Sequence, residues 1–148
     1  MLKTSSAILA TVLCAGVAYA SVPVGTLPPT QTKGDIAWIS GGIGMSQAKA
    51  FEQAEGSYPL TLEFLVKPEH KRTPAEFTAA IPTTITDSHG NKVLSATAHG
   101  PFMLLKLPAG HYTVAAVHRG HELVRHVVVG QGHHRVVFEW LVDQNMAA

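Results

Sequence analysis

The run GPFMLLKLPAGHYTV, residues 100–114, indicates two extended segments joined by a tight reversal. Leu105 and Leu107 flank Lys106 in the alternation of a half-buried strand. Pro108 restricts the backbone of the residue before it, and Gly110 tolerates the conformations that a sharp turn needs. We therefore expect two antiparallel strands connected through a Pro-Ala-Gly turn.

The same period of two runs through the rest of the chain from residue 58. Leu60, Leu62 and Phe64 share one face of an extended segment, whereas Thr61 and Glu63 share the other. The expected strands are 36–40, 58–66, 79–87, 93–98, 102–107, 111–117, 123–129 and 134–142. Short strands with a turn about every eight to twelve residues are typical of a sandwich or barrel, and no alternation with helices indicates a parallel sheet.

We therefore predict an all-β fold, an antiparallel β-sandwich of about seven to eight strands with one short N-terminal helix. Pro82 indicates that its strand lies at a sheet edge, because proline cannot donate to a ladder. The large apolar side chains that alternate along these strands form the predicted core: Leu60, Leu62, Phe64, Ile81, Ile85, Leu105, Leu107, Tyr112, Val114, Val136, Phe138 and Trp140.

The short helix is expected before the first long strand. Ser46 is a suitable N-cap, Phe51 belongs to an apolar stripe, and the helix would end at Ala54 before Gly56. Lys49 occupies the position where a capping box needs Glu or Gln, so the cap is expected to be weak.

The N-terminal residues have the features of a signal peptide. Lys3 precedes an apolar run at 7–17 that is too short to span a bilayer, and small residues surround a cleavage site near Ala20. The single cysteine, Cys14, lies in the removed part, so the mature protein cannot form disulfides. We expect a signal peptide at 1–20, a Pro-rich lead-in at 21–34, a lead-in strand and helix at 35–57, and a β-sandwich domain at 58–148. The mature protein would be periplasmic or secreted.

The charge balance argues against two classes of partner. Removing Lys3 from the 11 basic residues leaves 10 against 10 acidic ones, because residues 1–20 contain no Asp or Glu. A near-neutral protein lacks the positive field of a nucleic-acid or anionic-membrane binder. No second apolar run reaches transmembrane length, so no stable membrane insertion is expected. The sequence carries no signal for a particular oligomeric state.

Several segments together resemble a known family. Residues 58–65, TTITDSHGNKVL at 83–94, the run at 100–114 with its LPAG-x-Y turn, and RVVFEW at 135–140 resemble the carboxypeptidase regulatory-like domain, also described as transthyretin-like or prealbumin-like. SGGIGMSQA at 40–48 resembles the lead-in of small exported proteobacterial proteins built around one such domain. The resemblance implies a seven-stranded sandwich that serves as an accessory or binding module of the bacterial cell envelope.

The resemblance does not extend to catalysis. Hydroxyisourate hydrolase, an enzyme of the transthyretin-like group, carries histidines, an arginine and a C-terminal Tyr-Arg-Gly-Ser, whereas this sequence contains no such tetrapeptide and reads DQNMAA at 143–148. No GxSxG elbow is present, and GGIG at 41–44 lacks the Lys-Ser/Thr of a phosphate-binding loop. We expect no catalytic residues and no enzymatic activity, with this hydrolase as the disfavoured alternative.

Histidine is the one unusual component of the composition. All nine histidines follow residue 20, and a group of them lies within residues 111–134: His111, His118, His121, His126, His133 and His134. Neutral imidazole is a common ligand for zinc, copper and nickel.

The spacing of four of these histidines predicts two pairs. If Arg119 and Gly120 form a two-residue hairpin loop, His118 and His121 are directly opposed, with Cβ atoms roughly 4.5 to 5.5 Å apart. His111 and His126 would then be diagonal neighbours on the outer face.

The same register has a cost. It places Arg125 opposite Val114 on the inner face, which is unfavourable, so a bulge or a longer loop remains an alternative to this register. His133 and His134 are adjacent in an extended segment, so they point to opposite faces and cannot readily chelate together.

Three interpretations of the histidines remain open: a solvated sheet surface, a zinc or copper site at His118 and His121 with His111 and His126 as a second pair, or a pH sensor. The first requires no cofactor. Two function classes follow. One is an envelope module that binds a protein or glycan partner, and the other is a periplasmic metal-binding protein.

Overall fold

The computed structural model describes residues 25–68, 76–77 and 80–142. The expected signal peptide, including Cys14, lies outside the described residues. The described part contains one α-helix, α1 (Met45–Ala54), one 3₁₀ helix, η1 (Glu55–Ser57), and ten strands: β1 (Gln31–Lys33), β2 (Ile36–Gly41), β3 (Leu60–Pro68), β4 (Glu76–Phe77), β5 (Ile81–Asp87), β6 (Lys92–Ala98), β7 (Phe102–Lys106), β8 (Gly110–His118), β9 (His121–Val129) and β10 (His134–Val142).

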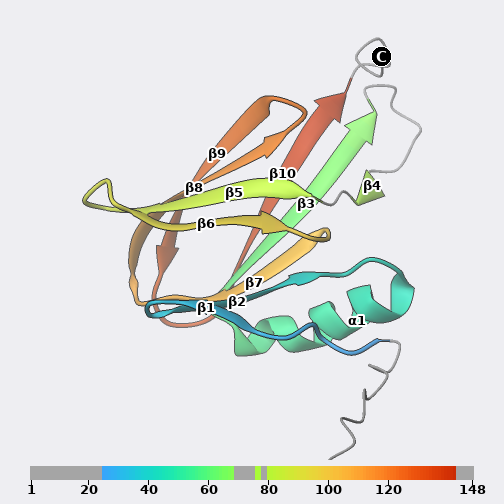
Figure 1. Cartoon of the computed structure of the whole chain (residues 1–148), viewed down its shortest axis with the longest axis horizontal. Coiled ribbons are helices and arrows are strands. Elements are labelled where there is room, and N and C mark those ends of the chain that lie inside the picture. The colour runs from blue at the N-terminus through green and yellow to red at the C-terminus, as the bar shows by residue number, and fades with distance from the viewer. Residues whose placement is uncertain (1–24, 69–75, 78–79, 143–148) are drawn as a thin grey trace, which may run out of the picture.

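The strands form two sheets that pack face to face (Figure 1). The six-stranded sheet has the order β1-β2-β7-β3-β10, and β4 pairs with the C-terminal half of β3 at Leu65 and Val66. The four-stranded sheet has the order β6-β5-β8-β9. The predicted all-β sandwich is confirmed. Its strands outnumber the expected ones because the short β1 and β4 join the sheet; β1 lies inside the expected lead-in.

One strand pair departs from the predicted antiparallel arrangement. β10 lies parallel to β3 along nine residues of each strand, from His134 opposite Leu60 to Val142 opposite Pro68. The reason is the path of the chain, since β10 follows β9 of the other sheet and crosses to the six-stranded sheet at the end where β3 begins. The backbone N–H of His134 donates to Pro59 O (2.9 Å) at this entry point.

The core fills the space between the two sheets. Every predicted core residue belongs to it, with Val136 only partly buried. Three aromatic rings from β3 and β10 lie at its centre: the centroids of Phe64 and Phe138 are 5.6 Å apart, and the ring of Trp140 lies 6.4 and 6.2 Å from these two. Such aromatic pairs stabilise by about 0.5–1.5 kcal/mol beyond the area they bury.

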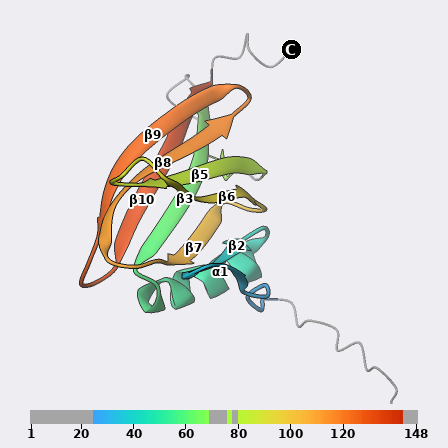
Figure 2. The same cartoon turned by 60° about the vertical axis from the view of Figure 1, so that its left-hand side comes forward.

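The helix covers the outer face of the six-stranded sheet (Figure 2). Phe51 is its one buried side chain and stacks on Phe102 at 6.0 Å, next to Ile39 and Leu104. Among the described residues, no helix has the length and hydropathy needed to cross a bilayer.

The predicted N-cap at Ser46 is wrong. Helix α1 begins two residues earlier than expected, at Met45, and its N-cap is Gly44, which has φ 84° and no side chain to cap it. Instead Gln47 reaches back, and its Oε1 accepts hydrogen bonds from the backbone N–H groups of Gly42 (2.8 Å) and Ile43 (3.2 Å). Gln47 is therefore the N3 residue, where a capping box places Glu or Gln, and the expected cap had been placed two residues too late.

The edge position expected from Pro82 is also wrong, because β5 lies between β6 and β8. Pro82 is opposite Thr97 of β6, and the pairing of β5 with β8 begins only at Thr83. Proline is tolerated here because the β5–β8 ladder stops at Thr83 opposite Ala116, although β8 itself continues to His118.

Gly100 fits against the backbone of β2 and leaves no room for a side chain. A Cβ at this position would overlap the carbonyl group of Gly41. We expect Gly100→Ala to lower the free energy of unfolding by about 3 kcal/mol, since backbone atoms rather than a flexible side chain must move. Gly130→Ala, which meets no atom within 4 Å, is the matched control, with an expected change within about 0.5 kcal/mol. Urea denaturation measures both, and equal effects would contradict the clash.

Candidate binding site at the β8–β9 hairpin

The β8–β9 hairpin has the predicted two-residue loop. Arg119 and Gly120 have φ values of 48° and 80°, and positive φ at both loop positions is what a type I′ hairpin turn requires. His118 and His121 are consequently register partners, which confirms the predicted juxtaposition.

The alternative of a bulge or a longer loop, which the position of Arg125 had left open, is not what this hairpin adopts. Arg125 lies directly opposite Val114, and the register runs without a shift from Gly110 to His118. The guanidinium group lies 5.4 Å from the ring centroid of Phe138, and its Nη1 donates to Val124 O (3.0 Å). A cation over an aromatic face and a long apolar stem make this inner position tolerable on an edge strand.

Trp140 of β10 joins the hairpin to the opposite sheet. Its indole Nε1–H donates to the carbonyl oxygen of His121 (2.9 Å), and its ring lies 5.6 Å from the imidazole of His118 at an interplanar angle of 48°. The hairpin end is thus fixed by a side chain that is itself part of the core.

A solvent-open hollow of about 520 Å³ lies between the hairpin end and the last residues of β10. It is lined by apolar, imidazole and charged side chains around the hairpin loop: His118, Arg119, Gly120, His121, Glu122, Leu123, Glu139, Trp140 and Leu141. Sequence reasoning had found only the two histidines of this set. The pairing of β10 with β3 brings the β10 residues to the hollow: Glu139, Trp140 and Leu141. No local sequence pattern predicts this pairing.

The two histidines differ in environment. His118 is half-buried and His121 is exposed. Desolvation lowers the pKa of His118, and the nearby Arg119 and His121 lower this pKa further. The imidazole of His118 therefore stays neutral to a lower pH than a free histidine.

The second predicted pair is diagonal, as expected. His111 lies opposite Val128 and His126 lies opposite Thr113, so the two histidines are offset by two residues along the ladder. Nδ1 of His126 shares a hydrogen bond with Thr113 Oγ1 (3.1 Å). In the described part of the chain, no group of three or more His, Cys, Asp or Glu side chains could hold a metal ion.

The last two histidines separate at the start of β10. His133 precedes the strand, and its Nε2 shares a hydrogen bond of 2.8 Å with Oγ1 of the fully buried Thr61, whereas His134 is exposed. His133 is therefore occupied in tying the β9–β10 connection to β3.

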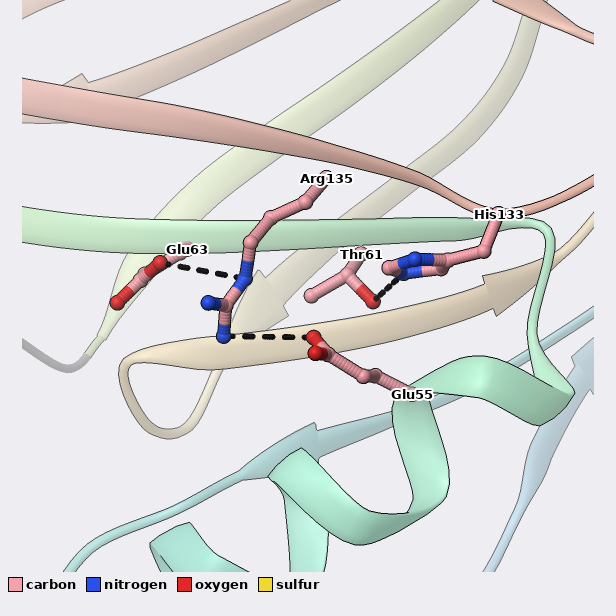
Figure 3. Close-up of polar contacts among 5 residues, drawn as sticks. All are labelled: Glu55, Thr61, Glu63, His133 and Arg135. Atoms are coloured by element: carbon pink, nitrogen blue, oxygen red, sulfur yellow. Dashed lines mark hydrogen bonds and ion pairs between the residues drawn. The ribbon is translucent and has the colours of Figure 1, made fainter.

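A polar cluster that sequence reasoning missed lies next to this hydrogen bond on the outer face of the six-stranded sheet (Figure 3). Arg135 of β10 contacts both Glu63 of β3 (Nε to Oε2, 3.4 Å) and Glu55 of η1 (Nη2 to Oε2, 3.3 Å). Its guanidinium also lies 5.7 Å from the ring centroid of Phe102. The alternation of Thr61 and Glu63 signalled a polar face, but only the pairing with β10 brings Arg135 to it.

Burial makes this cluster responsive to pH. Desolvation raises the pKa of Glu63 above its ordinary 4.5; Arg135 opposes the rise, and Glu55 and Glu52 add to it. The side chain of Glu63 is 12% exposed, so one arginine does not fully compensate its burial.

We expect Glu63→Gln to change the pH dependence of stability. A carboxyl group with a raised pKa in the folded state contributes stability that is complete below about pH 4.5 and is lost as the pH rises through the raised value. The wild type should therefore gain stability relative to Glu63→Gln as the pH falls from about 7 to about 4. Urea unfolding at a series of pH values measures this difference. Glu139→Gln, which removes an exposed carboxylate from β10, is the control, and the opposite slope would refute the assignment.

Comparison with known proteins adds no family to this geometry. No protein-family model matches the chain, and no curated protein matches its sequence. What the hairpin and its hollow can do follows from their own residues.

Proposed function

We propose that this chain is a non-catalytic binding module of the bacterial cell envelope, and that the hollow at the β8–β9 hairpin holds a protein or glycan partner. The observation that carries the proposal is the hollow itself. Its volume of about 520 Å³ falls within the range of about 300–1,000 Å³ typical of ligand pockets.

The lining of the hollow supports this role. Leu141 is 66% exposed, and the half-buried Leu123 adds apolar surface beside it, whereas Trp140 is almost completely buried behind them. Arg119, together with Glu122 and Glu139, supplies charged groups of both signs at the same place. Apolar surface provides affinity and a few charged groups orient a partner, which is the usual composition of a recognition site.

The position of the hollow also supports binding. Loops at the end of a β-sandwich are carried by a rigid scaffold, and such loops commonly bind partners. Here the type I′ turn and the hydrogen bond from Trp140 to His121 fix the hairpin, so little conformational entropy is lost on binding. The signal peptide expected at 1–20 and the resemblance to carboxypeptidase regulatory-like domains support an accessory role outside the cytoplasm.

The test compares two substitutions on the same face of β10. Leu141→Asp places a charge in the hollow, whereas Val137→Asp places the same charge on an exposed position (38%) outside it. Mature protein is assayed for co-sedimentation with peptidoglycan sacculi, and for affinity toward proteins isolated with it from the envelope fraction. We expect Leu141→Asp to weaken binding by about tenfold, equivalent to about 1.4 kcal/mol, and Val137→Asp to leave it unchanged.

Three results would contradict the proposal. These are undiminished binding by Leu141→Asp, equal losses in both variants, and the absence of saturable binding to either material. Circular dichroism of both variants checks that they are folded.

A further inference from the structure

His118 and His121 share three features that suit a metal site. They occupy directly opposed positions, they come from the two strands of one tight hairpin, and both line the same solvent-open hollow. Directly opposed residues have Cβ atoms about 4.5–5.5 Å apart. Two nitrogen ligands of a tetrahedral zinc ion lie roughly 3.3 Å from each other, given Zn–N bonds of about 2.0–2.1 Å, so imidazoles that lean together reach this separation.

The nitrogens of these two histidines are available. Within the described residues neither imidazole makes a hydrogen bond, whereas His126 is bonded to Thr113 and His133 to Thr61. The one donor of the neighbouring Trp140 is used by the carbonyl oxygen of His121, and an indole cannot accept in its place. Trp140 therefore confines the ring of His118 without occupying its nitrogens.

The rest of the coordination sphere would be open. No third protein ligand completes a group among the described residues, although Glu122 and Glu139 line the same hollow. An ion held by two imidazoles keeps positions for water or for a donor atom of another molecule. Imidazole ligands suit zinc and copper, and copper(II) binds the same nitrogen donors more tightly than zinc does.

We propose that His118 and His121 bind one zinc or copper(II) ion at the end of the β8–β9 hairpin, with the remaining coordination positions open. This site lies in the hollow proposed to hold a partner, but its ligands are the two imidazoles and do not include Leu141, so metal binding and partner binding can be tested separately. A metal ion here would be exchangeable and would give the hollow a Lewis-acidic centre.

Isothermal titration of the untagged mature protein with copper(II) and with zinc tests the proposal. We expect one ion per chain, tighter binding of copper, and a loss of affinity of at least about tenfold in His118→Ala and in His121→Ala. The control is the double variant His111→Ala with His126→Ala, which removes the diagonal pair from the same hairpin and should bind as the wild type does. Leu141→Asp should also retain the metal, which separates this test from that of partner binding.

Two spectroscopic readouts locate the ion. In the copper electron paramagnetic resonance spectrum, the nitrogen hyperfine structure should shrink to that of one imidazole in each single variant and disappear from the double variant His118→Ala with His121→Ala. Copper should also quench the fluorescence of Trp140, whose ring centroid lies 5.6 Å from that of His118. The measurement uses a Trp38→Phe background, because Trp38 lies on β2, three strands away from β10, and would add fluorescence from a distant position.

The proposal fails if either histidine variant keeps wild-type affinity, if the control pair loses affinity equally, or if the folded wild type shows no saturable binding. Should an alanine variant unfold, His118→Gln and His121→Gln take its place, because glutamine keeps much of the bulk but lacks the imidazole nitrogens.

Discussion

The pairing of β10 with β3 supports most of the other features of this protein. Phe138 lies directly opposite Phe64 in the parallel ladder, and Trp140 lies opposite Val66. The three aromatic rings therefore meet in the middle of the core, and their contacts are sensitive to register. A slip of one residue would move Phe138 and Trp140 to the outer face and bring Val137 and Glu139 inside.

The features around the hairpin depend on this register. Because Trp140 lies on the inner face, its indole N–H reaches the carbonyl oxygen of His121. Phe138, two residues earlier, lies on the same face, and its ring lies beside Arg125. On the outer face the same register brings Arg135 to Glu63 and Glu55. One strand thus contributes Trp140, Glu139 and Leu141 to the hollow at the hairpin end and Arg135 to the polar cluster on the outer face of its sheet.

Local patterns were enough to predict the strands and the core. Alternation placed Leu60, Leu62 and Phe64 on the inner face, and glycine and proline marked the reversals, because these signals act over a few residues. The Arg119-Gly120 loop was also predictable, since a two-residue turn with a glycine fixes the register of its two strands. The local pattern was misleading at Arg125. A charged side chain on the inner face is unfavourable by itself, and the sequence near Arg125 does not show that the ring of Phe138 lies beside it.

Long-range pairing could not be predicted in this way. Nothing near residue 140 shows that its strand runs parallel to β3, so the contribution of Trp140 and Leu141 to the hollow was hidden. Pro82 was misleading for a related reason: its sequence signal is that of an edge, but inside this sheet Pro82 pairs only with β6, because the β5–β8 ladder begins at Thr83. The role of Gln47 could not be predicted because Ser46 has a stronger sequence preference for an N-cap than Gly44, and Gln47 is the N3 residue only if Gly44 is the N-cap.

The parallel ladder also has a consequence for how the chain reaches its native state. Leu60 pairs with His134, which lies 74 positions later in the chain. All the other strands of the described part are synthesised before β10. Because such distant pairing requires a large loop to close first, a nascent chain that lacks β10 has no complete core and remains loosely ordered. Under the proposed export, late completion of this kind would leave the chain without its tertiary structure until the whole polypeptide has crossed the membrane.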